Sequence, residues 1–81
     1  MPITYDDRTV TMEGACGVEE VPALAEWLDA AASPLVDLRS STHLHTAIVQ
    51  ALAEARVPVS GAPVDPFLAL WVAPLLPIAA H

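Results

Sequence analysis

Short apolar runs, polar turns and amphipathic stretches alternate along this chain. Residues 3–5 and 9–12 have the composition of two short strands, and the polar pair Asp6 and Asp7 between them predicts a hairpin turn. Val21, Leu24 and Leu28 recur at the helical period, so they predict a helix with its first turn at the acidic residues 19–20 and its end near residue 31.

A buried strand and a second helix follow. Residues 35–38 form a short, mostly apolar run that is typical of a strand buried on both faces. The next helix is expected to begin between Thr42 and Thr46. Its expected inner face consists of Leu44, Ile48, Leu52 and Ala55.

The last third of the chain predicts an edge strand and a third helix. Pro58 cannot donate a hydrogen bond to a sheet, so residues 57–59 are assigned to an edge. Asp65 and Pro66 are the residue types that cap and open a helix. The expected apolar stripe of that helix is Phe67, Leu70, Trp71 and Leu75.

The predicted order is strand, strand, helix, strand, helix, strand, helix. Strands that alternate with helices favour parallel pairs, and the initial hairpin makes the sheet mixed. We therefore expect an α/β fold with a small mixed four-stranded sheet and about three helices. We treat residues 1–81 as a single domain, since a chain of 81 residues has the length of one domain. A hydrophobic content of 54% argues against disorder.

Charge excludes several classes of partner. The chain has ten acidic residues, three arginines and no lysine, for a net charge of −7. Neither nucleic acid nor an anionic membrane surface suits that charge. The uncharged run at 66–80 is shorter than the ~20 residues of a spanning helix and is interrupted by two prolines.

Cys16 is the single cysteine and nothing resembles a signal peptide, so we expect a cytoplasmic protein.

A motif runs from residue 36 to residue 52: it contains Val36-Asp37-Leu38, then Thr42-His43-Leu44-His45-Thr46, and then a helix with Gln50-Ala51-Leu52. This motif and the order of elements resemble the STAS domain, named for sulfate transporters and anti-sigma factor antagonists. The resemblance extends from about residue 9 to residue 76 and is strongest in this motif. In that family a switch Ser or Thr opens the helix after such a strand; Thr46 holds this position, and His45 replaces the preceding Asp.

The resemblance implies a non-enzymatic, STAS-like module of bacterial signal transduction, with a kinase-like or sigma-regulatory protein as its partner. Phosphorylation of Thr46 would add charge at a helix N-terminus and weaken docking. The simpler interpretation is that Thr42 or Thr46 is only an N-cap. The implied partner surface consists of Arg39, Ser40, Ser41, Thr42, His43, His45 and Thr46.

Other chemistries have weaker support. His43 and His45 are spaced to share a metal in an extended segment, with Cys16 or His81 as a third ligand. The alternative is two loop histidines that cap a helix or form local hydrogen bonds. We expect no cofactor. Cys16 is interpreted as a small buried apolar residue, with the acidic pair at 19–20 raising its pKa.

Catalysis is not expected. Ser41, His45 and Asp37 are the residue types of a nucleophile, a base and an orienting acid, but nearness in sequence is poor support for a triad. No nucleophile-elbow or phosphate-loop motif is present. We therefore assign no catalytic residues.

We expect Phe67 and Trp71 either to pack in the core or to form a protein interface where the last helix cannot bury them. One such interface is that of a homodimer. A structural subunit of a larger assembly is a third interpretation of this apolar C-terminus.

Overall fold

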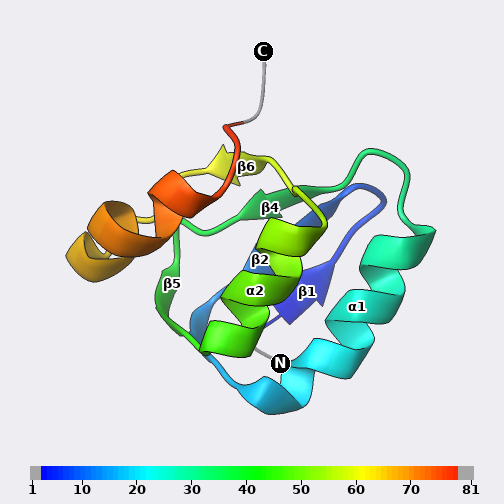
Figure 1. Cartoon of the computed structure of the whole chain (residues 1–81), viewed down its shortest axis with the longest axis horizontal. Coiled ribbons are helices and arrows are strands. Elements are labelled where there is room, and N and C mark those ends of the chain that lie inside the picture. Colours follow the sequence, from blue (N-terminus) through cyan, green and yellow to red (C-terminus); the bar gives the residue numbers. More distant parts are fainter. Residues whose placement is uncertain (1–2, 79–81) are drawn as a thin grey trace.

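A four-stranded mixed sheet forms the centre of the computed structural model, which describes residues 3–78 (Figure 1). The strand order is β1-β2-β4-β6, with β1 antiparallel to β2 and the other neighbours parallel. The strands are β1 (Ile3–Tyr5), β2 (Thr9–Met12), β4 (Leu35–Asp37) and β6 (Val59–Gly61). The predicted hairpin is confirmed, and its turn is closed by a hydrogen bond of 2.8 Å from Asp6 N–H to the Thr9 carbonyl.

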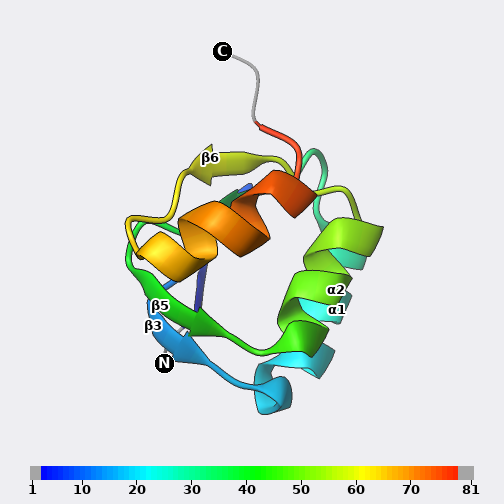
Figure 2. The same cartoon turned by 60° about the vertical axis from the view of Figure 1, so that its left-hand side comes forward.

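Two helices lie side by side across one face of this sheet (Figure 1). They are α1 (Val21–Ala30), preceded by the short 3₁₀ helix η1 (Val18–Glu20), and α2 (Thr46–Glu54). A third helical segment, made of the π-helix η2 (Leu68–Val72) and the 3₁₀ helix η3 (Ala73–Leu75), lies apart from them, between β6 and β5 (Figure 2). The described residues therefore form a small mixed α/β fold with a four-stranded mixed sheet and three helices, as predicted.

The sheet and the two helices enclose a continuous apolar core. Val10 and Val36 are register partners in β2 and β4, and neither is exposed. Val36 and Leu38 are fully buried as predicted, whereas Leu35 is only half-buried. The other core side chains without exposed surface include Met12, Leu24, Ile48, Leu52 and Val57. Ala55, which we assigned to the inner face of α2, is exposed because the helix ends at residue 54.

Two further strands were not predicted. β3 (Gly14–Cys16) and β5 (Ser41–Leu44) pair in parallel and continue the chain from the ends of β2 and β4. Gly14 bends the first of these segments with a φ of +63°, a conformation that glycine adopts without strain. Its N–H donates to the Ser40 carbonyl at 2.8 Å. The prediction that β4 leads through a turn directly into a helix was therefore wrong.

The last strand lies at a sheet edge as predicted, but it spans residues 59–61 and not 57–59. β6 lies at one end of the strand order, and Pro58 precedes it. The Val59 N–H donates to the Pro77 carbonyl at 2.8 Å, and Val59 forms an isolated parallel bridge with Ile78. The chain following η3 therefore covers part of this sheet edge.

The third helix begins where predicted but exposes the opposite face. One carboxylate oxygen of Asp65 accepts from Phe67 N–H at 3.1 Å and from Leu68 N–H at 3.2 Å, which makes Asp65 the cap. The predicted buried stripe of Phe67, Leu70, Trp71 and Leu75 is exposed. Leu68, Val72 and Leu76 are buried in its place.

Candidate binding surface at the start of α2

The entry into α2 is capped by an imidazole. His45 has an extended backbone (φ −60°, ψ 145°), and its Nδ1 accepts from the Ala47 N–H at 3.0 Å. A nitrogen that accepts this bond carries no proton, so the cap requires the neutral ring. Thr46 is the first residue of the helix, and its side chain is exposed. The interpretation of Thr42 or Thr46 as the N-cap was therefore wrong, and the alternative of a capping loop histidine is confirmed for His45.

Side chains of β5 divide between the core and the surface. Ser41 is 1% exposed, and its hydroxyl donates to the Met12 carbonyl at 2.6 Å. This bond satisfies a buried polar group, so Ser41 cannot present its hydroxyl to a partner, and the prediction that it belongs to the binding surface was wrong. Thr42 and His43 are exposed, and Leu44 is buried.

A charged pair lies where β4 ends. The Arg39 guanidinium contacts the Asp37 carboxylate at 2.8 Å, and the Arg39 backbone N–H donates to the same carboxylate at 3.0 Å. The Arg39 side chain is 70% exposed, whereas that of Asp37 is 15% exposed. Hydrogen bonding to Arg39 holds the pKa of Asp37 below its ordinary value, and partial burial opposes this shift. A Cβ at Gly61 would overlap the Asp37 carboxylate, so a larger residue there would displace the Asp37 side chain from this position.

This pair was missed in the sequence. Asp37 was considered as part of the strand motif and as an orienting acid, and Arg39 as a partner contact, but the two were not paired. The available signal was an acid and an arginine two residues apart at the end of a buried strand. Ser40, in the turn that follows, is exposed, and its carbonyl is engaged by Gly14.

The two histidines and the cysteine lie in different environments. His43 and His45 are exposed, and one ring nitrogen of His45 is occupied by the cap. Cys16 has no exposed surface, and its thiol lies 3.9 Å from the Glu13 carbonyl. Within residues 3–78 no three His, Cys, Asp or Glu side chains are grouped as metal ligands, and His81 lies outside the described residues. Cys16 therefore does not join the histidine pair.

The thiol of Cys16 has the environment expected from the sequence. Burial raises its pKa, and the nearby Glu20 carboxylate raises it further. Both effects disfavour the reactive thiolate. This confirms the interpretation of Cys16 as a small buried apolar residue.

The three residue types considered for catalysis each have a different partner. Ser41 donates to a backbone carbonyl, Asp37 binds Arg39, and His45 caps α2. No hydrogen bond joins any two of these side chains in the part of the chain that is described. Nucleophilic catalysis requires a nucleophile within hydrogen-bond reach of its base, so these residues do not form a triad in this structure.

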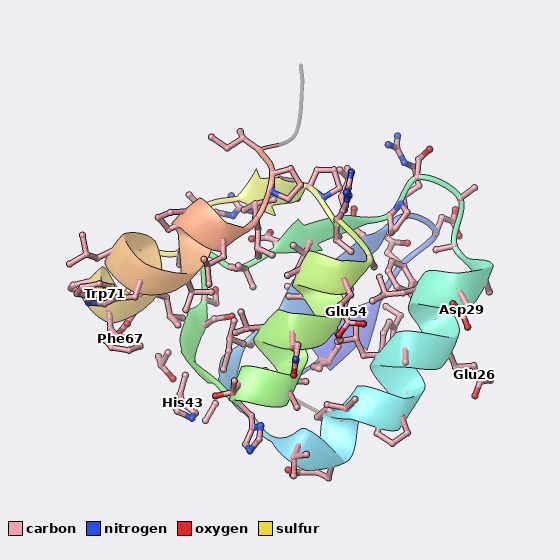
Figure 3. The ribbon with its side chains drawn as sticks, in the orientation of Figure 1. Glu26, Asp29, His43, Glu54, Phe67 and Trp71 are labelled. Atoms are coloured by element: carbon pink, nitrogen blue, oxygen red, sulfur yellow. The ribbon has the colours of Figure 1, made fainter. Side chains whose placement is uncertain are left out.

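The surface at residues 39–46 adjoins an apolar region. Figure 3 shows His43 beside the end of the C-terminal segment that presents Phe67 and Trp71, and β5 packs against η2. A cavity of about 500 Å³ lies between that segment and β6. Its lining includes Val59, Ser60, Ala69, Ala73, Leu76 and Ile78.

No protein-family model matches this chain, and neither does any curated protein or any solved structure. Among the described residues, no helix has the length and apolar character that crossing a membrane requires. The fold and this surface define a small α/β protein with an exposed hydroxyl at the first turn of a capped helix.

Proposed function

We propose that this protein is a non-enzymatic interaction module of the STAS type, which acts in the cytoplasm of a bacterium by docking on a kinase-like or sigma-regulatory protein. The observation that carries the proposal is the exposed Thr46 at the first turn of α2. It occupies the position that the STAS resemblance assigns to the switch residue.

The proposed docking surface is the turn after β4, the exposed side of β5 and the first turn of α2. Its members are Arg39, Ser40, Thr42, His43, His45 and Thr46, all of them exposed. They supply a guanidinium, hydroxyls and imidazoles within one short stretch of chain. Such a surface suits hydrogen bonding at a polar, reversible protein interface better than it suits an enclosed small-molecule site.

A phosphate on Thr46 would lie at the positive end of α2. Backbone N–H groups and the helix dipole favour negative charge there by about 0.3–1 kcal/mol. The Ala47 N–H is already bound by His45, so the helix is capped before modification. Phosphorylation is therefore expected to leave the fold intact and to weaken docking by adding nearly two negative charges to the surface.

Capture from native lysate with three baits tests this proposal. The baits are the wild type, Thr46→Glu and Gln50→Glu; the last adds the same charge to an exposed position of α2, one turn further along. We expect the wild type and Gln50→Glu to recover the same partner and Thr46→Glu to recover much less of it. Intact mass of the protein from native cells reports whether Thr46 carries phosphate.

Equal recovery by all three baits would contradict docking through Thr46. Equal loss with both glutamate variants would mean that overall charge, and not the position of Thr46, controls binding. Thermal unfolding of each bait is the control for folding, and all three are expected to unfold alike.

A further inference from the structure

Large apolar side chains cluster on the outer side of the C-terminal segment. Phe67, Leu70, Trp71 and Leu75 are 64%, 66%, 63% and 62% exposed. We name these four residues the C-terminal patch. Figure 3 shows Phe67 and Trp71 together at the outer end of the segment. Outside residues 64–78, the one exposed large apolar side chain in the described part of the chain is Val18, at 53%.

The area of the C-terminal patch is large for so small a protein. A large apolar side chain buries on the order of 150–250 Å² when it is fully covered, so four that are nearly two-thirds exposed leave roughly 500 Å². The whole described surface is 4950 Å². Val64 and Ile78, at 78% and 85% exposed, extend the apolar surface at the two ends of the segment. Monomeric proteins rarely expose apolar patches larger than a few hundred Å².

Charge limits what can cover the patch. Residues 66–80 contain no charged side chain, while the chain as a whole carries −7. A membrane surface is disfavoured because anionic headgroups attract Lys and Arg, and none lies in this segment. The patch itself contributes no carboxylate, so two copies that meet through it place no like charges of the patch against each other. The patch therefore allows contact between two equally acidic chains.

We propose that the C-terminal patch is covered by the same patch of a second copy, which makes the protein a homodimer. A two-fold axis places one surface against itself, so each of the four side chains finds an apolar partner. Together the two copies would bury roughly 1,000–1,200 Å², which lies at the lower end of specific interfaces and corresponds to a reversible dimer.

Sedimentation equilibrium of the full chain tests the dimer. We expect the mass to rise with concentration from 8.5 kDa towards twice that value, with a dissociation constant in the micromolar range. Trp71→Ser is expected to weaken association at least tenfold. Val18→Ser removes an exposed apolar side chain outside the patch and is expected to dimerise like the wild type. A mass of 8.5 kDa up to ~1 mM would overturn the proposal.

Fluorescence identifies the surface that is buried. In Trp27→Phe the single remaining tryptophan is Trp71, and its emission is expected to shift to shorter wavelength as the mass doubles. A doubled mass without that shift, together with full dimerisation of Trp71→Ser, would place the interface elsewhere and overturn the proposal. Thr46→Glu is expected to dimerise normally, so this result is independent of the proposed docking through Thr46.

Discussion

The layer of α1 and α2 and the C-terminal segment are both rich in apolar residues. The helices bury their large apolar side chains, whereas the C-terminal segment exposes several of its own. Leu24 of α1 and Leu52 of α2 face the sheet with no exposed surface. In the C-terminal segment Leu70 and Trp71 face outward, and smaller or equal side chains such as Val72 face the core. Apolar spacing alone therefore identifies a buried face only where the opposite face is polar.

In α1 and α2, charged residues indicate which face of each helix is buried. Glu26, Asp29 and Glu54 are exposed on the outer surface of α1 and α2 (Figure 3). Because these carboxylates occupy the outer side of the helices, the apolar side chains can only face the sheet, and that orientation was predicted correctly. Residues 66–78 have no charged side chain, so either stripe was compatible with a buried face.

Paired leucine truncations sharpen this comparison and give its largest expected effect. Leu52→Ala is expected to reduce the free energy of unfolding by about 2–5 kcal/mol, because it leaves a cavity in the core. Leu70→Ala makes the same chemical change at an exposed position and is expected to change stability by less than ~0.5 kcal/mol in the monomer. Urea unfolding at a concentration below dimerisation measures both, and similar losses would mean that the C-terminal patch is buried in the monomer.

The sequence predicted the elements that carry a clear period. The hairpin of β1 and β2, the buried centre of β4, the edge position of β6 and the helices α1 and α2 were all found near their expected places. β3 and β5 were missed, because β3 consists of Gly, Ala and Cys, of which Gly and Ala are uncommon in strands, and β5 is mostly polar. Their pairing joins segments distant in sequence, which local composition does not reveal.

The candidate surface was predicted in outline. Exposure of Thr46 followed from its place at the start of a helix. Both a threonine and a loop histidine were considered as the cap, and composition alone did not decide between them, because hydroxyl side chains are the usual caps and imidazole is not. Burial of Ser41 depends on the Met12 carbonyl, 29 residues away. The pair of Asp37 and Arg39 was overlooked, although the two residues are near neighbours in sequence.

Substitution of the capping histidine gives a smaller effect, confined to the layer of α1 and α2. His45→Ala removes the acceptor for the Ala47 N–H and is expected to lower the free energy of unfolding by about 1 kcal/mol. His45→Asn supplies another good N-cap and is expected to recover most of the loss. Equal destabilisation by both variants, measured by urea unfolding, would contradict a capping role.

Removal of the Asp37 charge, at the last residue of β4, gives the smallest effect. Because Arg39 lowers the folded-state pKa of Asp37, the ionised carboxylate stabilises the fold above the unfolded-state pKa. That contribution is lost as pH falls through the lower folded-state pKa. Asp37→Asn is therefore expected to be less stable than the wild type at neutral pH, and the difference is expected to shrink below pH ~4. A difference that does not depend on pH would contradict the ion pair.

The most direct measurement for the proposed function is the affinity of the purified partner, identified by lysate capture, for three forms of the full chain. Calorimetric titration onto the wild type and Gln50→Glu is expected to give the same dissociation constant. Thr46→Glu is expected to bind at least ~10-fold more weakly, a difference of about 1.4 kcal/mol. Equal dissociation constants for all three forms would show that the exposed first turn of α2 is not the docking surface.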